Sequence, residues 1–207
     1  MCKNIKFLEV VIDKHLIWND HIDTVASKIS RTIWIISKSK HFISETPVFK
    51  LYYSLVYPYL YYGNIVWGSA YKSNLTRLNV LQKRIIRIIT RSSFDAHTAP
   101  LCHIYIYHLL TLDNIHLLQV ALFMFSVHSI PSTFQTMFNK NSVIHQYATR
   151  QANDYKVHFS RTNILKFSIV SSGPRLWNSL PNDLKSKQSL ACFKNNLKKY
   201  LINLNNS

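Results

Sequence analysis

Apolar residues recur every three or four positions along several parts of the chain, which is the spacing of one face of an α-helix. On this pattern we expect helices over residues 19–40, 74–90 and 113–128, and a last helix from Ser189 onward. Asn19, Asp113 and Ser189 are the expected caps of the first, third and last of these. The helix over 113–128 is apolar almost all round, which predicts the central buried helix.

The stretch between the first two of these helices carries two prolines that punctuate it. Thr46–Pro47 predicts the start of a helix, and Pro58 should bend or end it. An aromatic stretch over residues 57–67 follows, which we expect to be a short helix or an extended piece that Gly68 closes.

Two β-branched runs, residues 5–12 and 163–170, have extended character and are the expected strands. Gly173–Pro174 and Leu180–Pro181 are expected turns. The fold class predicted is therefore mainly α, a helical bundle with one or two short β-strands or a small hairpin. The expected organisation is residues 1–18 as a strand and turn, 19–128 as a helical domain, 129–160 as an irregular surface connection, and 161–207 as a C-terminal strand, turn and helix.

The net charge of the chain indicates which classes of partner it is suited to bind. The 207 residues contain 25 Lys and Arg against 9 Asp and Glu, a formal net charge of +16. Such a positive field favours a polyanion, and we expect nucleic acid first and an acidic membrane surface second. No apolar run reaches the roughly 18–20 residues that span a bilayer, and no N-terminal signal pattern is present, so an intracellular location is expected and no membrane partner.

The helix over 74–90 places its basic residues together, away from its apolar side. On a helical wheel they occupy an arc of about 120°, and no acidic residue lies between Lys72 and Arg91. This basic stripe is a candidate nucleic-acid-binding surface; its other interpretation is a solvated face. The candidate residues are Arg77, Lys83, Arg84, Arg87 and Arg91, with Lys194, Lys198 and Lys199 of the last helix as an extension if that helix lies nearby.

Catalytic and cofactor sites find little support in the residues. Three glycines cannot supply a phosphate-binding loop, and the acidic pairs Glu9 with Asp13 and Asp20 with Asp23 do not resemble a two-metal cluster. Cys102, His103 and His108 fit no metal-ligand spacing. His97 beside Asp95 is more typical of a local hydrogen bond than of a hydrolase. We therefore expect no catalytic residue, no metal and no cofactor.

Aromatic residues are concentrated before Gly68. They could offer stacking surfaces for bases, although packing in the core with hydroxyls at the rim is the commoner role. The residues concerned are Tyr52, Tyr53, Tyr57, Tyr59, Tyr61, Tyr62 and Trp67.

Taken together, several motifs resemble one family in that family's order. Phe7–Asp13 followed by Leu16–Ile22 resembles the segment after the palm in reverse transcriptases (RNA-directed DNA polymerases) of non-LTR retrotransposons (LINE elements) of the jockey and chicken-repeat type. The later motifs that continue the resemblance are Leu51–Leu60, Asn64–Gly68, Leu81–Ile89, Arg161–Asn163, Gly173–Pro181 and Ser189–Leu201.

The resemblance implies a thumb-like helical module that follows the palm and lacks both the palm aspartates and the endonuclease. It implies RNA and DNA as partners, as a template–primer held through its backbone, and the palm domain as a further partner, without polymerase activity in this chain alone. Glu9 departs from the family's glycine, and we expect it to distort the strand. The alternatives are a catalytically inert interaction or self-associating module, or a degenerate, non-functional copy of an element.

Overall fold

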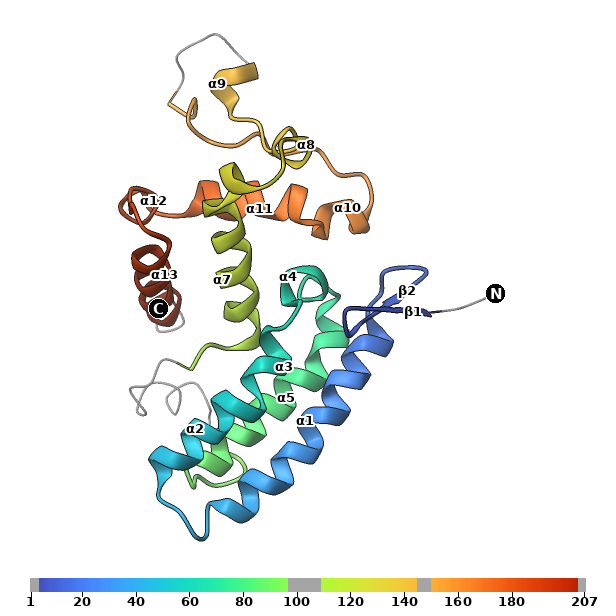
Figure 1. Ribbon diagram of the computed structural model, residues 1–207, viewed down its shortest axis with the longest axis vertical. Coiled ribbons are helices and arrows are strands. Elements are labelled where there is room, and N and C mark those ends of the chain that lie inside the picture. Colours follow the sequence, from blue (N-terminus) through green and yellow to red (C-terminus); the bar gives the residue numbers. More distant parts are fainter. Residues whose placement is uncertain (1–3, 97–108, 145–149, 205–207) are drawn as a thin grey trace. The chain divides into compact units, whose positions relative to one another are not determined.

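The computed structural model describes residues 4–96, 109–144 and 150–204, and it is mainly helical, which confirms the expected fold class (Figure 1). The chain forms two compact units, Met1–Ile115 and His116–Ser207. The first contains β1 Asn4–Phe7, β2 Val10–Asp13, α1 Asn19–Ser39, α2 Glu45–Leu55, α3 Tyr57–Tyr61, α4 Asn64–Trp67, α5 Lys72–Ile89 and the start of α7 Leu112–Phe125. The second contains the rest of α7, the 3₁₀ turn Val127–Ser129, α8 Ser132–Gln135, α9 Asn141–Ile144, α10 Asn163–Phe167, α11 Ile169–Ser179, α12 Asn182–Lys185 and α13 Leu190–Leu204.

The strand expected over residues 5–12 is an antiparallel hairpin, with Phe7 of β1 opposite Val10 of β2. The chain reverses at Leu8 and Glu9, whose φ angles are 45° and 63°. A two-residue hairpin turn of this hand needs positive φ at both positions. The strands pair in regular register on either side of the turn, so the expectation that Glu9 distorts the strand is wrong: the residue lies in the turn itself. β1 is exposed throughout, whereas β2 is half-buried against α1.

The link between the hairpin and α1 is organised by one carboxylate. Asp13 accepts the backbone N–H groups of His15, Ile17 and Trp18 at 2.9, 3.0 and 2.6 Å. Burial acts to raise the pKa of Asp13, but these three bonds outweigh it and hold the pKa below its ordinary value. The cap predicted at Asn19 is wrong: Trp18, with φ of 69°, precedes the helix and Asn19 is its first residue.

α1 and α5 pack along their length and run in the same direction (Figure 1). Arg77 at the start of α5 binds Asp23 at the start of α1, and Arg91 just after α5 reaches the end of α1. The apolar spacing predicted the contact face of α1 correctly, since the residues that it placed inward are all buried: Ile22, Val25, Ala26, Ile29, Ile33 and Ile36.

α2, α3 and α4 fill the connection between α1 and α5. α2 begins at Glu45 after Ser44, so the predicted start at Thr46–Pro47 is slightly late and Pro47 lies inside the first turn. α2 ends before Pro58, as expected, and α3 resumes with that proline in its first turn. Of the aromatics, Tyr52 and Trp67 are fully buried, and α4 ends at Trp67 with Gly68 directly after it.

Gln82 of α5 connects this helix to α2 and to the segment before α7 through buried hydrogen bonds. Its buried side-chain amide donates to the Tyr52 hydroxyl and to the Leu110 carbonyl, each at 2.9 Å, and its oxygen accepts the Leu112 N–H at 3.0 Å. Thr111, rather than the predicted Asp113, caps α7, because its hydroxyl accepts the Asn114 N–H at 3.3 Å. A threonine hydroxyl satisfies such a first-turn N–H well.

In the second unit, the strand predicted over 163–170 is wrong, because that run forms α10 and the start of α11. The Thr162 hydroxyl accepts the Leu165 N–H and so starts a helix where the residues alone looked extended. Gly173–Pro174 lies within α11 and not in a turn. A β-carbon on Gly173 would lie 2.7 Å from Met124 Sδ, so glycine allows α11 to approach α7 closely. Leu180–Pro181 separates α11 from α12, as expected.

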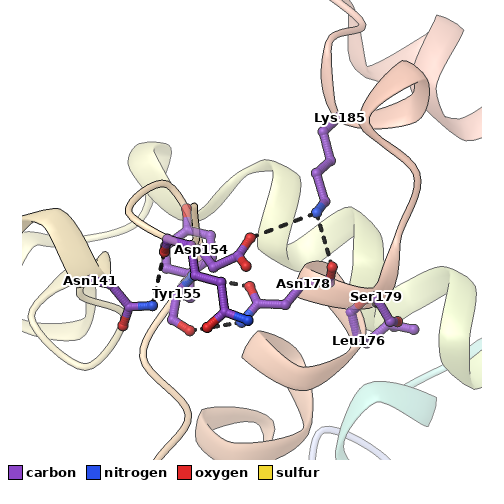
Figure 2. A network of polar contacts seen from close by, with 8 residues as sticks. Asn141, Asp154, Tyr155, Leu176, Asn178, Ser179 and Lys185 are labelled. Carbon is purple, nitrogen blue, oxygen red and sulfur yellow. Dashed lines mark hydrogen bonds and ion pairs between the residues drawn. The ribbon is translucent and has the colours of Figure 1, made fainter. Parts of the chain in front are cut away.

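Asn178 anchors the segment before α10 to α11 (Figure 2). Its side chain donates to the Tyr155 carbonyl at 2.8 Å and accepts the Tyr155 N–H at 3.0 Å, which reproduces the pairing of two strands. Lys185 donates to the Asn178 carbonyl at 3.1 Å and lies 4.0 Å from Asp154.

α13 completes the second unit. The Ser189 hydroxyl accepts the Cys192 N–H at 3.2 Å, which confirms the predicted cap. Phe193, Leu197 and Leu201 are buried on one side, as the spacing predicts.

Among the helices of the described ranges, none has both the length and the apolar character that crossing a membrane requires.

Candidate nucleic-acid interface

The basic stripe lies on α5, opposite the residues that this helix buries. Leu75, Leu78, Ile85 and Ile89 face inward. Arg77, Lys83, Arg84 and Arg91 are exposed, and Arg87 is half-buried. Arg77, Lys83, Arg84 and Arg87 therefore lie outside the apolar side of α5, and Arg91 follows the end of this helix with a φ of 51°.

Three of the five arginine and lysine side chains make contacts within the first unit. Arg77 forms an ion pair with Asp23. Arg87 donates through Nε to the Ala96 carbonyl at 2.9 Å and lies over the Phe94 ring, 5.9 Å from its centroid. Arg91 donates to the carbonyls of Lys40 and Ile43 at 3.0 and 3.2 Å. These residues tie α5 to α1 and to the chain that follows α5, although a guanidinium has five donors and can also meet a phosphate.

Lys83 and Arg84 differ from the other three. Neither side chain forms a hydrogen bond or ion pair with any residue in the described part of the chain. Both are exposed, and α5 contains no carboxylate that would neutralise them. These two side chains are the ones most available to an external anion.

The sequence spacing did not single out the outer face of α1, which lies beside this stripe. Arg31, Trp34 and Lys38 are all exposed there, and no acidic residue occurs from Thr24 to Ser44. The signals in the sequence were this run of basic residues without a carboxylate and an aromatic residue outside the apolar spacing of the helix. The positive region of the first unit therefore extends beyond α5.

Lys194, Lys198 and Lys199 belong to α13 of the second unit. Lys199 is exposed, and the other two are half-buried. Burial lowers the pKa of Lys198, and the neighbouring charge of Lys194 lowers it further. That these lysines continue the α5 stripe stays a prediction.

Of the carboxylates in the first unit, those of Glu9, Asp13, Asp20 and Asp23 have structural partners. Glu9 binds Lys6 at 2.7 Å and Lys28 at 3.6 Å, Asp13 holds the turn before α1, and Asp20 accepts the Asn4 amide. Within the ranges that the structure covers, no three His, Cys, Asp or Glu side chains gather as metal ligands would. His97, Cys102, His103 and His108 lie outside the described residues.

Part of the chain is similar to known proteins of mobile elements. It is 30% identical over 97 residues to the RNA-directed DNA polymerase from mobile element jockey of Drosophila melanogaster, which covers 45% of this chain and 10% of that protein. It is 27% identical over 89 residues to the probable RNA-directed DNA polymerase from transposon X-element, and 30% identical over 89 residues to that from transposon BS, both of the same organism. Each of these two matches covers 41% of this chain and 10% of the relative.

These similarities confirm the resemblance to jockey-type retrotransposon reverse transcriptases. The chain spans about a tenth of the length of the curated relatives that it matches. No protein-family model matches it, and no solved structure does.

Proposed function

We propose that this chain acts as the part of a retroelement reverse transcriptase that grips nucleic acid, as a thumb-like module without catalytic activity of its own. The similarity to RNA-directed DNA polymerases supports a role with RNA and DNA. The net charge of +16 supports a polyanionic partner. The carboxylates described above bind lysines, arginines, an amide or backbone N–H groups, which disfavours a role for them in holding catalytic metal ions.

The observation that carries the proposal is the state of Lys83 and Arg84. Both side chains are exposed and lack a partner among the described residues, on a helix free of acidic side chains. Contacts from such side chains to phosphate oxygens would position a nucleic acid without reading its sequence. Arg77, Arg87 and Arg91 would add phosphate contacts with the donors that their internal bonds leave free.

The test is the salt dependence of binding. Each phosphate that a cation neutralises releases condensed counterions and contributes about 0.9 units to the slope of log K against log salt on duplex DNA. The double variant Lys83→Gln/Arg84→Gln should therefore flatten the slope by about two units on a mixed-sequence RNA–DNA hybrid. The variant should weaken binding to nucleic acids of unrelated sequence by the same factor. Arg87 and Arg91 are left intact because their loss would also disturb the fold.

The matched control is Lys14→Gln/Lys50→Gln, which removes the same charge from exposed positions that belong to neither α5 nor α1. Its slope should stay close to that of the unmodified chain. If both double variants change binding equally, the basic stripe is only a solvated face and the proposal fails.

A second candidate function is self-association through the hairpin. Ile5 and Phe7 of β1 are 65% and 63% exposed, and β1 is paired only with β2 among the described strands. An apolar edge strand is a template for pairing with another strand. Sedimentation at increasing protein concentration would show dimers that Ile5→Thr/Phe7→Thr abolishes. A monomer at all concentrations would exclude this candidate.

A further inference from the structure

Trp34 is an exposed aromatic side chain on α1, a helix whose other apolar residues are buried apart from Ile35. It is 66% exposed, whereas Trp18 and Trp67 are buried and Trp177 is half-buried. Neither a hydrogen bond nor a ring contact joins its side chain to the described residues. Its indole face is therefore available to something outside the chain.

The helical repeat places Trp34 on the edge of α1 that faces the basic stripe. A helix turns about 100° per residue, so Trp34 lies within about 20° of Asp23, three turns earlier. Asp23 binds Arg77 of α5, which fixes this edge of α1 next to α5. Trp34 consequently stands on the same edge as that ion pair.

The parallel course of the two helices then gives the neighbours of Trp34 on α5. At about 1.5 Å per residue, Trp34 lies about 16 Å beyond Asp23, whereas Arg84 lies about 10 Å beyond Arg77 and the end of α5 at Ile89 lies about 18 Å beyond it. The indole is thus level with the stretch between Arg84 and the end of α5. Ser27, Ser30 and Ser37 occupy the same edge of α1 and leave space beside it because their side chains are small.

The surroundings of Trp34 carry positive charge. Arg31 and Lys38 lie about 40–60° further round α1, at exposed positions. Asp23, the carboxylate on this edge, is already paired with Arg77. The result is an aromatic surface between two rows of cations, one on each helix.

We infer that this edge binds single-stranded RNA or DNA, with an unpaired base stacked on Trp34 and the adjoining phosphates on Arg84, Arg31 and Lys38. Aromatic side chains in a basic groove are the usual means of holding single strands, because every base has a π-face. In a duplex both faces of each base are already stacked, so the indole finds no partner there. This inference rests on the proposed function and adds an unpaired strand to the RNA–DNA hybrid as a ligand of the same surface.

A membrane surface fits this edge less well. Interfacial helices insert a continuous apolar face among the lipid chains. The apolar face of α1 is buried against its neighbours, so only Trp34 and Ile35 would remain on its outer side to enter a bilayer.

Intrinsic tryptophan fluorescence tests the inference on the whole chain. A mixed-sequence single strand of about 15 nucleotides should quench the emission of Trp34 on binding, and a duplex of the same length should quench it far less. Trp34→Ala should weaken single-strand binding by roughly 5- to 150-fold, which corresponds to about 1–3 kcal/mol per stacked base. Trp34→Phe should lose the quenching but keep most of the affinity.

The control is Phe159→Ala, which removes an aromatic that is 88% exposed in the second unit and should leave binding unchanged. If Trp34→Ala binds a single strand with full affinity while Lys83→Gln/Arg84→Gln binds the RNA–DNA hybrid more weakly, the stacking is overturned and the proposed function stands. Equal losses on single strands and duplex would also overturn it. If the chain binds vesicles of anionic lipid through Trp34 and binds neither oligonucleotide, both the stacking and the proposed function are overturned.

Discussion

At the scale of single residues, Glu9 occupies a backbone position that suits glycine. Its φ of 63° lies in the left-handed region, where a β-carbon comes too close to the following carbonyl oxygen. Its ion pairs with Lys6 and Lys28 are at the surface and compensate weakly. The glycine that the resemblance implies at this position therefore has a physical reason in the hairpin turn.

Glu9→Gly should stabilise the first unit. The change relieves the left-handed strain and loses only exposed ion pairs, so we expect the thermal midpoint to rise by roughly 2–5 °C in far-UV circular dichroism. Glu9→Gln is the matched control, because it removes the charge and keeps the strained backbone. Similar melting of the Gly and Gln variants would mean that the turn is not strained.

At the scale of elements, His21 links the hairpin to α1. Its ring is buried, 5.4 Å from the Trp67 ring between centroids, and its Nδ1 accepts the Val11 N–H at 3.3 Å. Burial lowers the pKa of His21, and the charge of Lys28 lowers it further. Only the neutral ring can accept the Val11 bond.

Acid should therefore loosen this contact. Because the pKa of His21 is lower in the folded chain than its ordinary 6.5, the unfolded chain binds more protons as the pH falls past that value, and stability decreases. The urea concentration at the unfolding midpoint should decrease as the pH is lowered from about 7 to about 5. His21→Gln, which does not titrate, should show a flatter profile; an equally steep one would assign the pH dependence to other groups.

Apolar spacing predicted α1, α5, α7 and α13 because each buries a continuous face over several turns. It failed at residues 163–170, a run too short for its period to distinguish helix from strand, where the Thr162 cap decides. For the candidate site, spacing placed the basic residues on α5. It could not foresee that Arg77 and Arg91 bind groups 54 and 51 residues away, or that Trp34 stays exposed.

At the scale of the whole molecule, the net charge of +16 lowers the stability of the folded chain and raises its affinity for a nucleic acid. Like charges brought together in the compact state repel one another, and salt screens them. The same salt weakens the attraction of a nucleic acid. Stability and affinity should consequently respond to ionic strength in opposite directions.

We expect the melting temperature of the free chain to rise from about 20 to about 200 mM NaCl, within which range the Debye length shortens markedly. Lys14→Gln/Lys50→Gln, with two fewer positive charges, should melt higher at low salt and gain less from added salt. A melting temperature that falls with NaCl would show that ion pairs such as Arg77 with Asp23 outweigh the repulsion.

The parallel pairing of α1 with α5 has a consequence for the newly made chain. Arg77 is synthesised 54 residues after Asp23, and α1 and α5 can pack together only after that. At synthesis rates of about 5–20 residues per second, this interval lasts between about 3 and about 11 s. Throughout it, the isoleucine-rich face of α1 has emerged from the ribosome without the helix that covers it, and is open to chaperones or to neighbouring nascent chains.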